Sequence, residues 1–249
     1  LTGDFNGDGA TDIAIVAPSD IYSPTWPTTV SILKLLSDKK GGFAQLPAQQ
    51  TNWFHECYTN PDRGVGHSGG GDPAKCVNDL MFAVFAGDVN GDGISDIMYA
   101  GHRAAGGSVV RTNLHVDTSP STGLDTFRWM IADTNGDQYE DRTYVYPMNP
   151  GVRVYALFGN SNPIAEDHFA GLQNPVMRNW KTMDVGGGPN GVPDGKADLV
   201  YVSTLNATTG TGTRIYTLLA KGNGTWEEKP PFDLANVNAP DSLYWKPAD

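Results

Sequence analysis

Short apolar runs alternate with clusters of turn-forming residues along the whole chain. The runs are rich in valine, isoleucine, tyrosine and leucine, which favour β-strands, and they are separated by glycine, proline, asparagine and aspartate. The 249 residues include 30 glycines and 17 prolines, so little in the sequence favours helices. The pattern predicts an all-β protein with a core of substantial size.

One polar-to-apolar pattern occurs four times. It first appears as "GDFNGDGATDIAIV" at residues 3–16, and it recurs as "GDVNGDGISDIMYA" from Gly87 and "ADTNGDQYEDRTYV" from Ala132. A longer form, "DVGGGPNGVPDGKADLVYV", begins at Asp184. Loop positions are counted below from the first aspartate of each copy, which is position 1. In the longer fourth copy the positions are assigned by correspondence, with Asp184 as position 1, Asn190 as position 3 and Asp194 to Asp198 as positions 5 to 9.

Each loop leads into a predicted strand. These first strands are expected at 13–16, 97–100, 143–146 and 199–203, and second strands at 29–36, 108–116, 152–158 and 214–220. A polar turn and an aromatic residue follow. Each of the three later copies ends with a tryptophan four residues before the aspartate that begins the next copy. We expect these tryptophans, Trp129, Trp180 and Trp245, to pack in the core.

The repeats predict a β-propeller, in which small antiparallel sheets are arranged radially. We expect one domain over residues 1–249, with repeats at about 1–83, 84–129, 130–180 and 181–249. A β-sandwich does not need one acidic loop four times. Because Asp249 stands at the same phase as Asp4, the four units are either part of a larger ring or a closed ring whose tail completes the first sheet. We favour the first alternative, in which the four units are part of a larger ring.

The acidic loops have the chemistry of a calcium site. Oxygen side chains at positions 1, 3, 5 and 9 and a backbone carbonyl at position 7 suit a hard cation with six to eight flexible ligands. The expected ligands are Asp4, Asn6, Asp8, Ala10 and Asp12; Asp88, Asn90, Asp92, Ile94 and Asp96; Asp133, Asn135, Asp137, Tyr139 and Asp141; and Asp184, Asn190, Asp194, Lys196 and Asp198. An EF-hand is excluded because position 12 is not glutamate and a strand follows at once.

Charge also favours a metal. Twelve of the 28 acidic residues hold expected ligand positions in these loops, and the chain carries a formal net charge of -11. Close unpaired carboxylates repel one another, so we expect up to four calcium ions. For any single loop, an aspartate-rich turn without an ion is the alternative. Gln138 replaces the glycine at position 6, where we expect a positive φ, and this conformation costs a residue other than glycine on the order of 1 kcal/mol. The fourth loop is lengthened. We therefore expect occupancy to fall from the first two loops to the third and then the fourth.

The loop D-x-N-G-D-G-x-x-D before a short strand, with a later turn such as "GNGTW", resembles the FG-GAP or VCBS repeat of integrin-α-like β-propellers. The resemblance implies calcium in rim loops, often a ring of about seven blades, and a secreted or cell-surface location. Members of this family include integrin head domains, a fungal sugar-binding lectin and propeller segments of bacterial toxin complexes.

The longest insertion between repeats is a second candidate site. Cys57 and Cys76 bracket a glycine-rich stretch, and we expect them to form a disulfide in an oxidising compartment. The candidate ligand-binding residues in and near this insertion are Trp26, Trp53, His55, Tyr58, Arg63 and His67, with the two tryptophans suited to stacking on a sugar. Asn206 and Asn223 lie in N-x-T sequons.

These features favour binding over catalysis. The acidic charge argues against nucleic acid as a partner, and no apolar stretch is long enough to span a membrane. The sequence shows no catalytic constellation. We expect a non-catalytic extracellular recognition module that binds a glycan or a protein, in the manner of a lectin or adhesion protein. The alternatives are a structural propeller segment of a large secreted toxin or surface protein, and a secreted carbohydrate-active enzyme.

Overall fold

The computed structural model describes most of the chain, and the statements below refer to that part. The described residues are 1–18, 28–55, 83–102, 108–111, 116–118, 129–148, 150–158, 164–169, 171–172, 180–206, 209 and 211–237. The chain divides into two compact units, Leu1–Phe127 and Arg128–Asp249. Each unit contains two antiparallel sheets, and we call the four sheets blades 1 to 4 in chain order.

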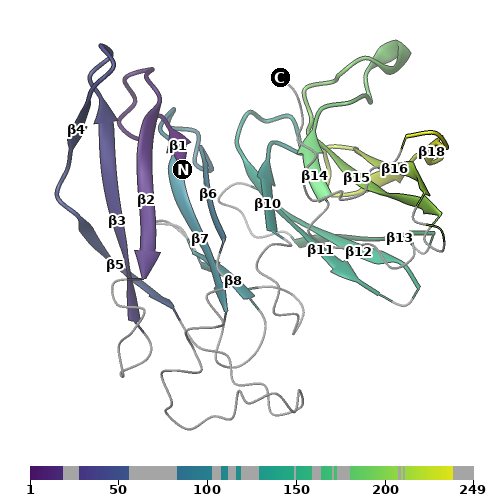
Figure 1. Ribbon diagram of the computed structural model, residues 1–249, viewed down its shortest axis with the longest axis horizontal. Helices are drawn as coiled ribbons and strands as arrows, with labels where there is room; N and C mark the ends of the chain where they lie inside the picture. Colours follow the sequence, from purple (N-terminus) through teal and green to yellow (C-terminus); the bar gives the residue numbers. More distant parts are fainter. Residues whose placement is uncertain are drawn as a thin grey trace, which may run out of the picture. The chain divides into compact units, whose positions relative to one another are not determined.

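The first unit contains blades 1 and 2 (Figure 1). Blade 1 consists of β1 (Thr2–Gly3), β2 (Asp12–Pro18), β3 (Thr28–Ser37), β4 (Phe43–Gln45) and β5 (Gln49–His55). Its strands lie in chain order from β1 to β4, and β5 pairs with β3 beyond the end of β4. Blade 2 consists of β6 (Ala83–Gly87), β7 (Asp96–His102), β8 (Ser108–Arg111) and β9 (Val116–Thr118), also in chain order.

The second unit repeats this arrangement in blades 3 and 4. Blade 3 consists of β10 (Trp129–Ala132), β11 (Asp141–Pro147), β12 (Val152–Leu157) and β13 (Ile164–Phe169). Blade 4 consists of β14 (Trp180–Met183), β15 (Asp198–Asn206), β16 (Thr211–Ala220), β17 (Trp226–Glu228) and β18 (Phe232–Leu234). The long strand β16 pairs with both β17 and β18, as β3 pairs with both β4 and β5. A 3-10 turn at Pro189–Gly191 lies in the lengthened fourth loop.

The all-β prediction is confirmed, and the strand after each acidic loop begins at position 9 in all four blades. The second repeat differs from expectation in one strand. The sequence predicts a single strand over 108–116, whereas β8 and β9 form two short antiparallel strands in which Arg111 pairs with Val116. This register requires the chain to reverse between these two residues, a reversal that the apolar pattern of the segment conceals.

The core of each unit lies between its two blades. In the first unit, Ala14 and Val16 of β2 share a buried cluster with Ile97 and Tyr99 of β7. In the second unit, Val145 of β11 belongs to a cluster that also contains Leu199 and Tyr201 of β15. Positions 11 and 13 of one blade therefore face positions 10 and 12 of the next, because side chains alternate between the two faces of a strand.

A series of aromatic rings crosses three strands in blade 3 and in blade 4, and the series in blade 4 belongs to the core of the second unit. Trp180, Tyr201 and Tyr216 are cross-strand neighbours on β14, β15 and β16, with ring centroids 5.2 and 5.8 Å apart. Trp129, Tyr144 and Tyr155 form the matching series in blade 3, at 4.9 and 6.4 Å. Trp129 and Trp180 are buried, as predicted; Trp245 lies outside the described residues.

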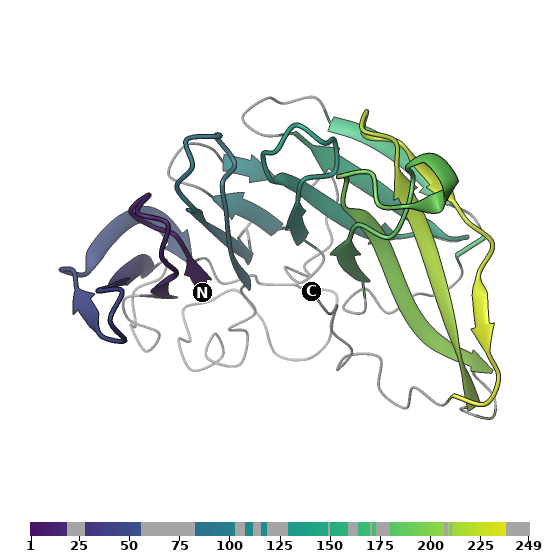
Figure 2. The same ribbon diagram turned by 90° about the horizontal axis from the view of Figure 1, so that it is seen from above.

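The acidic loops of each unit lie together. The loops that join β1 to β2 and β6 to β7 project from the same end of blades 1 and 2, and the loops before β11 and β15 do the same in the second unit (Figures 1 and 2).

Within the described residues, no helix is long and apolar enough to cross a membrane.

Removal of one ring from the aromatic series should destabilise the fold strongly. We expect Tyr201→Ala to lower the free energy of unfolding by about 3 kcal/mol, because the ring is buried and its loss leaves a cavity. The matched control is Tyr139→Ala, whose side chain is 40% exposed and which should change stability by less than about 0.5 kcal/mol. Urea denaturation followed by circular dichroism measures both values. Equal losses in the two variants would contradict this assignment of the core.

Candidate metal-binding loops

One hydrogen bond closes each acidic loop at its base. The backbone N–H of position 2 donates to the carboxylate of position 9 in every copy. The pairs are Phe5 to Asp12 (2.9 Å), Val89 to Asp96 (3.2 Å), Thr134 to Asp141 (2.9 Å) and Val185 to Asp198 (3.0 Å). The lengthened fourth loop therefore closes in the same way as the three compact ones.

Two further hydrogen bonds within the loop also occur in all four copies. The N–H of position 6 donates to the carboxylate of position 1, at 2.7 to 2.8 Å. The N–H of position 7 donates to the carboxylate of position 5, at 2.8 to 3.1 Å. The Gly9 amide lowers the pKa of Asp4 below its ordinary value, and the Ala10 amide does the same for Asp8, because each donates to the charged form. The backbone thus orients the carboxylates in all four loops, and in the first loop it favours the ionised form of Asp4 and Asp8.

The position 9 carboxylate is the buried anchor of the loop. Asp12, Asp141 and Asp198 are fully buried, and Asp96 is 7% exposed. In blades 1 and 4 the second carboxylate oxygen accepts an N–H from the next long strand, Ser37 of β3 and Ala220 of β16, both at 2.8 Å. Burial raises the pKa of Asp198, with the two amides acting in the opposite direction.

Left-handed backbone at position 6 brings the amides inward. Gly9, Gly93 and Gly195 have φ between 78° and 82°, and Gln138 adopts the same conformation at 74°. The expected positive φ at Gln138 is confirmed. Position 4 is also left-handed in the three compact loops, where it is always glycine.

Neighbouring loops within a unit interlock through their backbones. The Ser95 N–H, at position 8 of the second loop, donates to the carbonyl of Asp4 at 2.7 Å, and the Ala197 N–H donates to that of Asp133 at 2.6 Å. A Cβ placed on Gly7 would lie 3.1 Å from the Ile94 side chain, and one on Gly136 would lie 3.2 Å from Lys196. The same contact between position 8 and position 1, beside the same close approach, therefore occurs in both units.

The predicted ligands are arranged in one way in the three compact loops and in another way in the lengthened fourth loop. Positions 1, 3, 5 and 9 of the compact loops share one network, since the position 3 asparagine accepts the position 5 N–H at 2.8 to 3.0 Å in each. Asn190 lies instead in the 3-10 turn of the fourth loop, and Asp194 N–H donates to Asp184. Two lysine side chains reach position 5: Lys39, which the sequence did not single out, lies 3.6 Å from Asp8, and Lys196, expected to act only through its carbonyl, pairs with Asp194.

The donor chemistry fits a hard cation. Carboxylate and amide oxygens alternate along each compact loop, and a carboxylate oxygen that accepts one N–H keeps a second lone pair. Within the described residues, no group of three or more His, Cys, Asp or Glu side chains is placed to hold a metal ion.

Comparison with known proteins supports the repeat assignment. Residues 1–33 match the family model of the FG-GAP repeat. This matched segment covers the first acidic loop, and the other three loops share its hydrogen bonds. A search of curated proteins gives no match. Among solved structures, the chain is similar to the Photorhabdus luminescens Tc holotoxin pore, with 16% identity and a TM-score of 0.46 over 93% of this chain and 9% of that chain.

The second candidate site lies mainly outside the described residues. Trp26, Cys57, Tyr58, Arg63, His67 and Cys76 are not described, and for Trp53 and His55 only the backbone is, within β5. The disulfide and the sugar-stacking role therefore stay predictions. The sequence also does not predict the contact made at position 8, because that residue donates through its backbone N–H and can be serine or alanine.

The left-handed position 6 can be tested by a reciprocal pair of substitutions. We expect Gly93→Ala to lower the free energy of unfolding by about 1 kcal/mol through backbone strain alone, because an added Cβ would meet no atom within 4 Å. We expect Gln138→Gly to raise it by about 0.5 kcal/mol, since relief of strain outweighs the added freedom of the unfolded chain. Thermal unfolding measures both effects. Gln138→Ala is the control and should be neutral; a stabilisation equal to that of glycine would contradict the strain.

Proposed function

We propose that this chain is a non-catalytic, calcium-stabilised segment of a larger extracellular β-propeller, as a structural part of a secreted toxin or surface protein. The observation that carries the proposal is the exposure of position 12 in the repeat. Tyr99 and Tyr201 hold this position in the second blade of each unit and are at most 4% exposed, whereas Ile15 in blade 1 is 51% exposed.

The direction of blade packing explains why this exposure matters. In the first unit, positions 10 and 12 of blade 2 share a cluster with positions 11 and 13 of blade 1, and in the second unit positions 10 and 12 of blade 4 share one with position 13 of blade 3. Ile13 and Ile15 hold positions 10 and 12 in blade 1, and they pair across the sheet with Leu35 and Leu33. Blade 1 thus presents an apolar face of the kind that receives a preceding blade. The Thr11 N–H, at position 8, matches the donors that join the loops within each unit.

Calcium binding is supported by the shared loop geometry. Three compact loops and one lengthened loop, all different in sequence, keep the same three amide-to-carboxylate hydrogen bonds, which orient oxygen donors without neutralising their charge. Calcium accepts flexible oxygen coordination and is abundant outside cells. The residues that would hold it are those at positions 1, 3, 5, 7 and 9.

The recognition hypothesis has less support than the structural one. The match to an FG-GAP repeat concerns the blade itself, and the residues singled out for glycan stacking lie mainly outside the described part of the chain. An extracellular location accords with the repeat type. A lectin or adhesion role therefore ranks behind the structural segment.

Calcium removal should destabilise the chain. A site occupied at a hundredfold excess over its dissociation constant stabilises the native state by about 2.7 kcal/mol, so chelation should lower the melting temperature by several degrees per occupied site. Differential scanning calorimetry measures the shift, and magnesium should restore less of it than calcium. Asp88→Ala should reduce the calcium-dependent shift, while Asp233→Ala, outside the loops, should leave it intact. An unchanged melting temperature on chelation would contradict the calcium part of the proposal.

The larger propeller can be tested at Ile15. We expect Ile15→Lys to change the stability of the 249-residue chain by less than about 1 kcal/mol, because the side chain is half exposed. In the full-length product of the gene, the same substitution should destabilise the propeller by several kcal/mol, because it would bury an unpaired charge between blades. Proteolysis under partly denaturing conditions compares the two. A full-length product that tolerates the substitution equally well would overturn the proposal.

A further inference from the structure

The fourth acidic loop differs from the compact loops in the group that lies beside its position 5 carboxylate. The Lys196 ammonium donates to one oxygen of Asp194, and the Lys196 backbone N–H donates to the other at 3.1 Å. One residue therefore engages both carboxylate oxygens of a predicted calcium ligand. In the compact loops, position 7 is alanine, isoleucine or tyrosine, and none of these side chains carries a positive charge.

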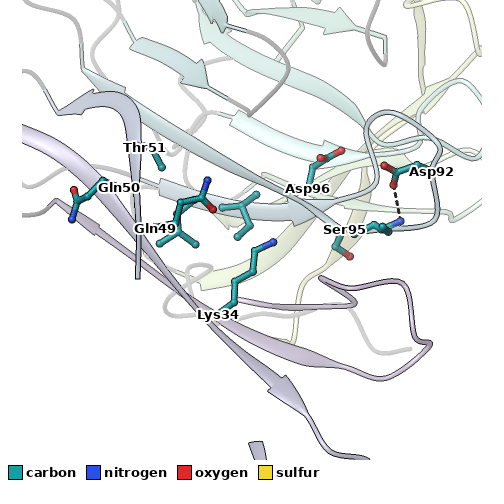
Figure 3. Close-up of a pocket in the computed structure, with 10 residues that line it drawn as sticks. Lys34, Gln49, Gln50, Thr51, Asp92, Ser95 and Asp96 are labelled. Carbon is teal, nitrogen blue, oxygen red and sulfur yellow. Dashed lines mark hydrogen bonds between the residues drawn. The ribbon is translucent and has the colours of Figure 1, made fainter. Parts of the chain in front are cut away.

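Position 5 is arranged differently in the second and third loops. Asp92 accepts the Ile94 N–H at 2.8 Å, and Figure 3 draws this bond as a dashed line at the labelled Asp92. Asp137 accepts the Tyr139 N–H and the Asn135 side-chain amide, both at 2.9 Å. In the part of the chain that the structure describes, no ion pair joins either carboxylate to a lysine or arginine. Their negative charge is therefore left for a bound cation.

The Lys196 side chain is held by packing as well as by charge. It is 20% exposed, and its partner Asp194 is 14% exposed. A Cβ placed on Gly136 of the third loop would lie 3.2 Å from Lys196 Cγ, and one on Gly222, between β16 and β17, would lie 3.1 Å from Lys196 Cδ. By contrast, the Lys39 side chain, whose ammonium lies 3.6 Å from position 5 of the first loop, is 54% exposed. The third loop and the turn after β16 therefore restrict Lys196 in a way that Lys39 is not restricted.

The insertion in the fourth loop moves the position 3 ligand out of the network. Residues 187–193 fold back on themselves, with a bridge between Gly187 and Pro193, and Asn190 lies exposed midway along them. A Cβ placed on Gly187 would lie 2.6 Å from the Asp194 carboxylate, so the backbone of the insertion fills the space beside this group. In the compact loops the position 3 asparagine accepts the position 5 N–H, whereas here position 1 accepts it. The fourth loop therefore lacks one of the oxygen donors that the compact loops bring together.

We propose that the Lys196 ammonium takes the place of calcium in the fourth loop, and that calcium binds in the compact loops only. This inference rests on the proposed calcium binding of the compact loops and assigns a different cation to the fourth. A calcium ion beside Asp194 would also lie beside the ammonium, and like charges at close range repel each other. The fourth loop keeps the three shared amide-to-carboxylate hydrogen bonds, so it has the same base with a cation supplied by the chain itself.

Calcium titration of the metal-stripped 249-residue chain tests the assignment by calorimetry. Asp88→Asn and Asp184→Asn change the same position 1 in the second and fourth loops, and circular dichroism establishes that each variant is folded. We expect Asp88→Asn to lose one calcium site, because a ligand charge is removed, and Asp184→Asn to keep the site number of the unaltered chain. Equal site numbers in the two variants would overturn the inference alone. An unaltered chain that binds no calcium would reject the proposed calcium binding together with it.

The charge of Lys196 can be tested without calcium. In the presence of a chelator, Lys196→Met should lower the melting temperature by about 4 °C or more, because it leaves a mostly buried carboxylate without its cation. Lys39→Met is the matched control and should lower it by less than about 2 °C, since that pair is more exposed. Equal shifts in the two variants would contradict the role of Lys196. If Lys196→Met does not fold without calcium, the comparison of position 1 variants decides by itself.

Discussion

The buried carboxylate at position 9 is the constraint on which each blade depends. It begins the strand, accepts the N–H of position 2 and so closes the loop; in blades 1 and 4 it also binds the next long strand. A charge taken out of water is costly unless it is paired or hydrogen-bonded, so the backbone around it has few alternative conformations. The loop and the sheet are therefore fixed together by one side chain.

The same constraint positions one blade against the next. Once position 9 is anchored, positions 10 to 13 alternate between the two faces of the strand, and the position 8 amide is presented to the preceding loop. Ser95 and Ala197 use that amide in the same way in the two units. Blade packing and loop geometry are thus parts of one repeated unit, which is why a lengthened fourth loop retains the pattern.

The acidic loops concentrate negative charge. Backbone amides hold their carboxylates close together and leave net negative charge for a cation to neutralise.

The sequence by itself determined the repeat, the all-β class, the strand that follows each loop and the left-handed conformation of Gln138, because spacing and residue type control these locally. It did not reveal the reversal between β8 and β9, since the register of a short strand depends on its partner. Contacts made through the backbone, such as that of Ser95, leave no mark in side-chain identity. Only tertiary structure decides them, because they join residues far apart in the chain.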